Sequence, residues 1–212
     1  MNFAPLAPQG LAALVAFFLG SIPFSWILAR LRGGIDLRAT GSGNVGATNL
    51  ARSVGYGAGT LALLLDAAKG AAAVLLARAL AAEGPAGTTA EAIAGGLAIL
   101  GHSFTPFLRF RGGKGVATGA GVFAILAPWA LGVSVLVFAV AVAASRMVSV
   151  GSVLASATLP AAIFLLGGDR RVTALAILSS ALVIARHRSN LARILAGNEN
   201  RIGRRDRQGR PS

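Results

Sequence analysis

Long runs of apolar residues constrain this chain more than any other feature of its sequence. Seven runs can be marked, and they cover roughly Leu11–Leu28, Tyr56–Leu80, Ala90–Leu100, Val116–Leu126, Trp129–Ala144, Val150–Leu166 and Val172–Ala185. A membrane-spanning helix needs about 20 mainly apolar residues. Because the runs are continuous rather than alternating, they exclude the strands of a transmembrane barrel. We therefore expect an all-α integral membrane protein, a polytopic helix bundle with about seven transmembrane helices.

The composition excludes several other classes of protein. Hydrophobic residues make up 55% of the 212 residues and charged residues only 13%, about half the charge of a soluble domain. The net charge is +13, but nucleic-acid binders carry their basic residues on polar surfaces, so we expect no nucleic-acid partner. Cysteine is absent and there are two histidines, which disfavours a metal centre and leaves no thiolate chemistry.

The basic residues are distributed unevenly between the loops. Those after the first, third and fifth runs carry Arg30, Arg32, Arg38, Arg52, Arg109, Arg111, Lys114 and Arg146, and the C-terminal tail is rich in arginine. The positive-inside rule places these loops and the tail in the cytoplasm and the N-terminus outside. That arrangement needs an odd number of spans, which seven supplies, or five if two short runs are re-entrant. We expect one membrane-embedded domain over residues 1–200, followed by a basic cytoplasmic tail over 201–212.

The first loop with chemical character is GSGNVGATN, Gly41–Asn49, followed by Arg52. Its glycines can turn backbone N–H groups toward an anion, and the Arg52 guanidinium matches a phosphate or carboxylate. The string also fits G-x-G-x-x-G, but a dinucleotide site needs a soluble parallel sheet that the membrane runs do not provide. A merely flexible glycine loop is the alternative, although the density of side-chain donors argues against it.

The second such loop is RFRGGKGVATG, Arg109–Gly119, which surrounds Lys114 with glycines and opens into an apolar helix. Backbone amides, a helix N-terminus and a cation together can hold an anion. It is not a Walker A sequence, because Leu108 occupies the place of the first glycine and Gly115 that of the magnesium-binding Ser or Thr. Alternatively, the glycines only permit close helix packing and Lys114 is a topology charge.

Polar residues elsewhere have more than one interpretation. His187 and Asn190 are three residues apart at the cytoplasmic end of the seventh run, and share a face if helical. Asp66 and Lys69 lie three apart inside the second run, where a structural ion pair is expected. His102 could face a ligand or form a hydrogen bond at a helix end. Ser149 and Ser152 could cap a helix or line the site.

The ordered set of motifs closely resembles the bacterial acyl-phosphate:glycerol-3-phosphate acyltransferases, the PlsY family. The matches are GSIPFSWILAR at Gly20–Arg30, the GSGNVGATN loop with Arg52, LDAAKG at Leu65–Gly70, GHSFTPFLRFRGGKGVAT at Gly101–Thr118, and His187 with Asn190 and Glu199. Departures are small: Arg111 stands where Lys is common, and Asn198 and Asn200 flank Glu199. The resemblance covers about Gly20–Glu199.

The resemblance implies transfer of a fatty acyl group from acyl phosphate to the 1-hydroxyl of sn-glycerol 3-phosphate. By the same resemblance we expect Ser42, Arg52, Lys114, His187 and Asn190 to be catalytic, and Gly41, Gly43, Gly46, Thr48, Gly112, Gly113 and Gly115 to bind substrate or phosphate. From their positions in the sequence we add Asn44, Asn49, Thr118 and Ser152 to the expected binding residues. Asp66, Lys69, His102 and Glu199 are expected to be structural. The resemblance further implies no cofactor, a monomer in the bacterial inner membrane, and a functional link to an enzyme that produces acyl phosphate.

We expect direct transfer without a covalent acyl-enzyme, because the chain has no cysteine and no apparent Ser-His-Asp triad. The predicted cytoplasmic loops between the runs hold Asp36 as their only acid. The general base is therefore either His187 or a phosphate oxygen of the donor, and we favour the latter, with His187 orienting glycerol 3-phosphate. The rivals are an organic-phosphate transporter, for which we find no internal repeats, a CDP-alcohol phosphotransferase, for which the Asp residues are too few and scattered, and a non-catalytic membrane-binding module.

Overall fold

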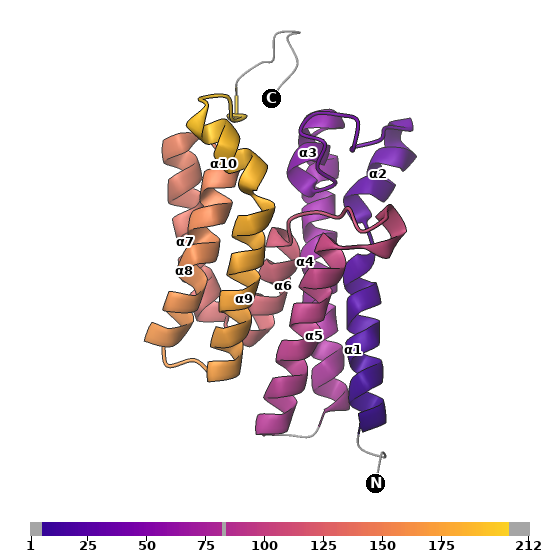
Figure 1. The fold of residues 1–212 in the computed structure, drawn as a ribbon, viewed down its shortest axis with the longest axis vertical. Coiled ribbons are helices and arrows are strands. Elements are labelled where there is room, and N and C mark those ends of the chain that lie inside the picture. Colours follow the sequence, from indigo (N-terminus) through magenta and orange to yellow (C-terminus); the bar gives the residue numbers. More distant parts are fainter. Residues whose placement is uncertain (1–5, 82–83, 204–212) are drawn as a thin grey trace. The chain divides into compact units, whose positions relative to one another are not determined.

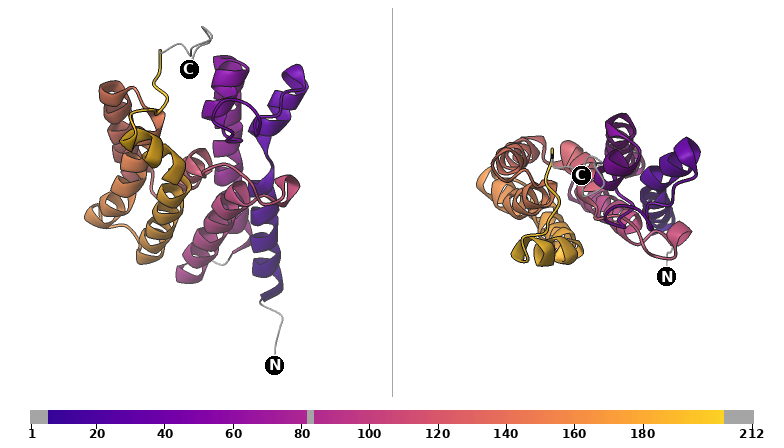
Figure 2. Two further views of the ribbon diagram at one scale, coloured as in Figure 1. Left: turned by 45° about the horizontal axis from the view of Figure 1, so that its top comes forward. Right: turned by 90° about the horizontal axis from the view of Figure 1, so that it is seen from above.

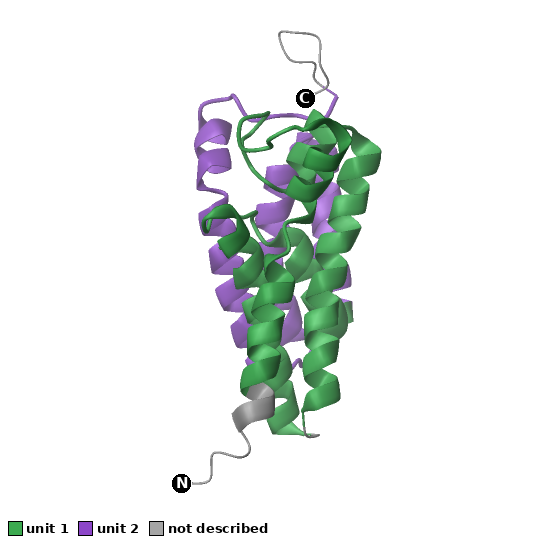
Figure 3. Ribbon diagram, turned by 90° about the vertical axis from the view of Figure 1, so that its right-hand side faces the viewer, with its two compact units in different colours: residues 1–128 green, residues 129–212 purple. Residues whose placement is uncertain are grey.

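The computed structural model describes residues 6–81 and 84–203, and every regular element in these ranges is a helix. The helices, shown in Figure 1, are α1 (Leu6–Ser21), α2 (Phe24–Gly33), α3 (Ala47–Ser53), α4 (Tyr56–Leu80), α5 (Pro85–Ser103), the 3₁₀ turn η1 (Pro106–Leu108), α6 (Val116–Leu126), α7 (Pro128–Ser145), α8 (Val148–Leu165), α9 (Arg170–Arg186) and α10 (Arg188–Leu195). The chain divides into two compact units, residues 1–128 and 129–212, coloured green and purple in Figure 3.

Four helical segments in the described ranges are long and apolar enough to cross a membrane. They are Gly10–Gly33, Tyr56–Leu80, Pro128–Ser145 and Val148–Leu165. The predicted run 116–126 is a helix with the same bounds, but it is only 11 residues long. The prediction of an all-helical membrane protein is therefore confirmed for four spans, whereas α5, α6 and α9 fall outside this set.

The first apolar run lies within the candidate span Gly10–Gly33, but it is not one continuous helix. α1 ends at Ser21 and α2 begins at Phe24, with Pro23 between them. Proline has no backbone N–H, and its ring clashes with the preceding turn of a helix. The break exposes backbone carbonyls in the middle of an apolar segment, and the groups that satisfy them are described below.

Glycines allow the helices of the first unit to approach one another closely. A Cβ built on any of four glycines would collide with the backbone of a neighbouring helix. The contacts join Gly20 to Ala98 and Gly101 to Phe17 between α1 and α5, and Gly70 to Thr118 and Gly121 to Ala67 between α4 and α6. Both views in Figure 2 agree with Figure 1 in placing α1 beside α5. Small residues at such crossings are typical of helix packing in membranes.

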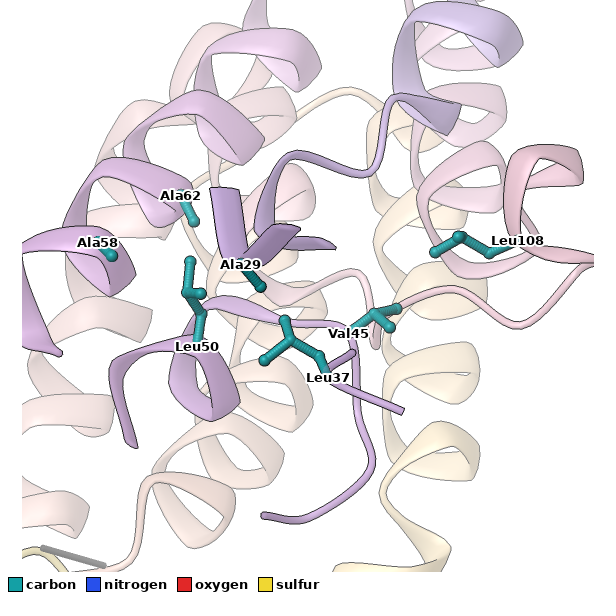
Figure 4. Close-up of a cluster of buried hydrophobic side chains, with 7 residues drawn as sticks. All are labelled: Ala29, Leu37, Val45, Leu50, Ala58, Ala62 and Leu108. Carbon is teal, nitrogen blue, oxygen red and sulfur yellow. The ribbon is translucent and has the colours of Figure 1, made fainter. Parts of the chain in front are cut away.

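An apolar cluster beneath the two glycine loops forms part of the core of the first unit. Its buried members, drawn in Figure 4, are Ala29, Leu37, Val45, Leu50, Ala58, Ala62 and Leu108. The segment before α3 contributes two of these side chains, and the turn η1 before the second loop contributes Leu108. The cluster therefore contains a residue of the first predicted anion-binding loop and the residue directly before the second.

In the second unit, α8 packs against α9, and α10 continues from the end of α9 after His187. α8 carries Pro160 in its interior and still runs from Val148 to Leu165. Arg146, between α7 and α8, has a φ of 60°, a backbone conformation that is uncommon for residues other than glycine. Its carbonyl accepts a hydrogen bond from the backbone N–H of Ile202, so the segment after α10 returns to the start of α8.

Candidate active site

The first glycine loop is organised around the buried side chain of Asn49. Its Oδ1 accepts a hydrogen bond from the backbone N–H of Ser42 over 2.9 Å. Its Nδ2 donates to three backbone carbonyls, those of Leu37, Thr40 and Asn44, over 3.1, 2.9 and 2.9 Å. Asn49 was expected among the substrate-binding residues, and in the structure its side chain holds the loop in shape.

The same side chain explains the glycine at position 41. Gly41 has a φ of +60°, and a Cβ there would collide with Oδ1 of Asn49. Gly43 also has a positive φ, and its N–H donates to the carbonyl of Thr40. Several N–H groups of this loop have partners inside it, and Ser42 and Arg52 remain the side chains that we expect to contact an anion.

Three other predicted residues complete this loop. Asn44 and Gly46 are half-buried, and Thr48 is exposed. Gly46 precedes α3 in an extended conformation and Thr48 lies in its first turn, while Arg52 lies in its last turn. The loop therefore presents an exposed hydroxyl at one end of α3 and a half-buried guanidinium at the other.

Asp36, the acid considered as a base for the cytoplasmic loops, is held by two arginines. Arg38 binds its carboxylate through Nε and Nη2, over 3.0 and 2.7 Å, and through its backbone N–H. Arg30 lies 3.3 Å from Oδ2. The hydrogen bonds from Arg38 hold the pKa of Asp36 well below its ordinary value, so this carboxylate is a poor proton acceptor.

The second loop lies against the end of α5. The N–H of Gly112 donates to the carbonyl of Ser103 over 3.1 Å, and that of Gly113 to the carbonyl of His102 over 3.0 Å. These two amides thus have partners within the chain, which differs from the expected arrangement in which they face an anion. Gly115 adopts a φ of +85° and directly precedes α6. Lys114, which lies between Gly113 and Gly115, is half-buried.

Thr118 lies in the first turn of α6 and is fully buried. Within the described residues its hydroxyl has no hydrogen-bond partner. Buried polar groups are normally satisfied. This hydroxyl, one turn from Lys114, is therefore an available donor at the start of α6.

Asp66 and Lys69 form the ion pair that their spacing predicts, with 2.7 Å between Oδ1 and Nζ and side chains that are both 2% exposed. Two further contacts were not foreseen from the sequence. Nζ of Lys69 donates to the carbonyl of Ile22, at the break between α1 and α2, over 2.7 Å. Nδ1 of His102 lies 3.5 Å from Oδ1 of Asp66, so His102 lies at a helix end beside an acid.

In the second unit, Glu199 is the centre of a buried polar cluster. It accepts hydrogen bonds from Ser149 over 2.9 Å, from Asn190 over 2.6 Å and from Arg193 over 2.8 Å. Burial by itself would raise the pKa of Glu199, but these three hydrogen bonds outweigh it, so the pKa lies below its ordinary value. Sequence analysis missed Arg193, whose position six residues before Glu199 in an arginine-rich segment gives no distinguishing signal.

His187 terminates α9 and is 3% exposed. Its Nδ1 lies 2.8 Å from the carbonyl oxygen of Val183. Since a carbonyl can only accept, Nδ1 is the donor in this contact. Ser152, expected at the substrate, is buried, and its hydroxyl donates to the carbonyl of Val148 within its own helix over 2.9 Å.

The candidate residues thus form two groups, each inside one unit. Ser42, Arg52, Lys114 and Thr118 belong to the first unit, and His187 and Asn190 to the second. Among the residues that the structure describes, no three His, Asp or Glu side chains gather where they could hold a metal ion.

The family is decided by comparison with known proteins. The model of the glycerol-3-phosphate acyltransferase family matches residues 10–197. The chain belongs to this family. It is 47% identical over 197 residues to the glycerol-3-phosphate acyltransferase of Anaeromyxobacter dehalogenans (strain 2CP-C), covering 90% of this chain and 96% of the relative. To the enzyme of the same name from Jannaschia sp. (strain CCS1) it is 47% identical over 196 residues, covering 92% and 93%.

Two solved structures of the family resemble this fold. The crystal structure of PlsY, an integral membrane glycerol 3-phosphate acyltransferase, in its glycerol 3-phosphate form matches with a TM-score of 0.86 at 38% identity, over 92% of this chain and 96% of that one. Its lysophosphatidic acid form matches with a TM-score of 0.83 at 36% identity, over 92% and 95%. The resemblance to the PlsY family inferred from the motifs is confirmed, and with it the assignment to an enzyme family.

Proposed function

We propose that this acyltransferase takes a fatty acyl group from acyl phosphate and transfers it to the 1-hydroxyl of sn-glycerol 3-phosphate. The products are lysophosphatidic acid and inorganic phosphate. The observation that carries the proposal is that one apolar cluster of the first unit contains Val45 of the first glycine loop and Leu108, the residue directly before the second. Two cationic loops fixed on a common support can hold two anions whose charges repel each other.

The proposed chemistry needs no enzyme nucleophile. Acyl phosphate is a mixed anhydride, so the glycerol oxygen attacks its carbonyl carbon directly, the bond between that carbon and the phosphate oxygen breaks, and phosphate leaves. Lys114 and Arg52 stabilise the charge that develops on the leaving phosphate. Ser42 and the hydroxyl of Thr118 supply further donors. No covalent acyl-enzyme forms.

The proton of the glycerol hydroxyl passes to an oxygen of the departing phosphate, and His187 orients glycerol 3-phosphate. Nδ1 of His187 contacts a backbone carbonyl rather than the carboxylate that supports the base in a Ser-His-Asp triad. Asp36 is held by Arg38 and is no competitor for the proton. Asn190, fixed by Glu199, joins His187 in this role.

The topology we propose has seven spans, formed by the four long apolar segments together with α5, α6 and α9. The N-terminus lies outside, and the glycine loops and C-terminus face the cytoplasm of a bacterial cell, where an acyl-phosphate-producing enzyme supplies the donor. Both units form one acyltransferase domain over residues 1–200, and the protein acts as a monomer. Residues 204–212 of the predicted basic tail lie outside the described residues.

Phosphate release by the purified protein in detergent tests the reaction. We expect release that requires both palmitoyl phosphate and glycerol 3-phosphate, that is lost in Lys114→Ala and that is retained in the control Arg32→Ala, which changes an exposed arginine. If only palmitoyl-CoA served as donor, the acyl-phosphate proposal would be wrong. If neither donor worked in a folded protein, an organic-phosphate transporter would become the better account.

Single-cysteine labelling tests the topology, because the chain contains no cysteine. A thiol at Ala39, which is exposed in the loop after the first span, should be protected from a membrane-impermeant maleimide in intact cells. A thiol at Leu166, exposed after α8, should react. The reverse pattern would overturn the orientation.

A further inference from the structure

The break between α1 and α2 is satisfied by donors from elsewhere in the first unit. The carbonyl of Ser21 accepts a hydrogen bond from Oγ1 of Thr105 over 2.7 Å. The carbonyl of Ile22 accepts one from Nζ of Lys69 over 2.7 Å. Thr105 is 1% exposed and Lys69 is 3% exposed, so both bonds are shielded from water. The break is therefore held from two sides, by α4 and by the segment that follows α5.

Lys69 has two stabilising partners in this apolar setting. Asp66 lies one turn earlier on α4, 2.7 Å away. The ring of Phe24, in the first turn of α2, has its centroid 5.6 Å from Nζ, within the range of a cation–π interaction. An intramembrane ion pair is expensive and is usually retained for a function.

The contacts continue from Asp66 to the second glycine loop. Nδ1 of His102 lies 3.5 Å from Asp66, and the carbonyl of His102 accepts the N–H of Gly113 over 3.0 Å. A Cβ on Gly113 would collide with Nε2 of His102, so the loop lies directly on the imidazole. Lys114 is the next residue. A continuous path of contacts thus leads from the break in the first span to the lysine that we assign to phosphate binding.

We propose that Lys69 and Thr105, with Asp66 as the counter-ion of Lys69, are positioning residues that dock the Lys114 loop onto the α1–α2 break. This rests on the proposed function only where it concerns turnover. The competing account is that Asp66 does no more than neutralise a buried lysine. The two accounts predict different results for the neutral double variant Asp66→Asn/Lys69→Met. It removes both charges, which the competing account tolerates, but it also removes the donor to the carbonyl of Ile22, which our proposal requires.

A thiol reporter measures docking without any activity. Ser103, at the end of α5, is fully buried, its carbonyl accepts the N–H of Gly112, and its hydroxyl lies close to Gly115. Ser103→Cys places a unique thiol there, because the chain has no other. We expect maleimide labelling to become about tenfold faster when Asp66→Asn/Lys69→Met or Thr105→Val is added, since local opening exposes the thiol.

The matched control is Arg78→Met, which breaks the ion pair of Arg78 and Glu91 between α4 and α5. It lies on the same helix pair but outside the path to the loop, and it should leave the labelling rate unchanged. An equal rise in this control would show general loosening and overturn the proposal. Thr105→Val introduces no buried charge, so it decides the matter even if the double variant does not fold.

Kinetics provide the second measurement, on variants that keep Ser103. In the double variant and in Thr105→Val we expect kcat/KM for palmitoyl phosphate to fall about 10- to 100-fold, mainly through KM, because misplacing an anchoring group has effects of this size. If both changes leave the labelling rate of Ser103→Cys as it is, and both variants that keep Ser103 turn over like the wild type, the positioning role is wrong. If the wild type itself releases no phosphate, the function proposal fails while the labelling result still stands.

Discussion

The side-chain amide of Asn190 donates a hydrogen bond to Oε1 of Glu199 over 2.6 Å, which ties α10 to the segment that follows it. Glu199→Ala leaves this buried amide and the hydroxyl of Ser149 without their acceptor. Each unsatisfied buried group costs about 1–3 kcal/mol, so we expect a lower thermal midpoint in detergent. The control Asn198→Ala changes an exposed neighbour and should unfold like the wild type. Equal midpoints for the two variants would contradict the role of Glu199.

The carboxylate of Glu199 should make the stability of the folded protein depend on pH. Its pKa is lower in the folded protein than the ordinary value of 4.5, so the folded state favours the ionised form. The stabilisation is complete above the ordinary pKa and is lost as pH falls through the depressed folded pKa. Glu199→Gln removes this contribution while Asp36, whose pKa is also lowered, is kept. The difference in midpoint between wild type and Glu199→Gln should therefore shrink below about pH 4.5. A difference that stays constant down to pH 3 would exclude this linkage.

Asn49 should be intolerant even of an isosteric change. In Asn49→Asp the three carbonyls of Leu37, Thr40 and Asn44 lose their donor and face a carboxylate instead. We expect at least a tenfold loss of kcat/KM, because reshaping the loop displaces Ser42, and misplaced catalytic groups cost up to about 100-fold. Phosphate release in detergent is the measurement. The control is Asn200→Asp, which changes a half-buried asparagine outside both loops. Normal turnover of Asn49→Asp would show that the loop needs no such anchor.

Two glycines in the second loop provide a matched pair of substitutions. A Cβ on Gly113 collides with the imidazole of His102, whereas a Cβ on Gly119 makes only an ordinary contact with Ile99, at 3.8 Å. Gly113→Ala should therefore shift the loop and reduce turnover by at least tenfold, as expected when a neighbouring catalytic group is misplaced by about 1 Å. Gly119→Ala should stay close to wild type. Similar activities for the two variants would exclude steric docking of the loop.

If an oxygen of the donor phosphate accepts the proton, His187 should affect the binding of glycerol 3-phosphate more than the rate of acyl transfer. In His187→Gln we expect KM for glycerol 3-phosphate to rise at least tenfold and kcat to fall less. Loss of a general base typically lowers the rate by about 10²–10⁴-fold. A fall of that size in kcat, with KM unchanged, would make His187 the base and overturn our assignment.

Much of the helical pattern could be predicted from the sequence, because long apolar runs have few alternatives in a membrane. The runs 56–80 and 116–126 became α4 and α6 with the same bounds. The break at Pro23 was missed, since the hydrophobicity on both sides continues without interruption. The ion pair of Asp66 and Lys69 could be foreseen, because both lie one turn apart on the same helix.

The use made of each polar side chain was harder to predict. Composition and spacing show that Asn49 and Ser152 are polar, but not that one binds its own loop and the other its own helix. The bond from Lys69 to Ile22 joins residues 47 positions apart. Contacts of this kind depend on which helices meet, and no local pattern in the sequence specifies that.

The glycine contacts along α4 have a consequence for how the two loops are spaced. Gly59 packs against Ala51 of α3, behind the first loop, and Gly70 packs against Thr118 of α6, behind the second. These two points lie about three helical turns apart, or about 16 Å along the axis. Because α4 is a continuous helix, it fixes the distance between these two contacts. The spacing of the two contacts that support the loops is therefore set by the geometry of α4 before either substrate binds.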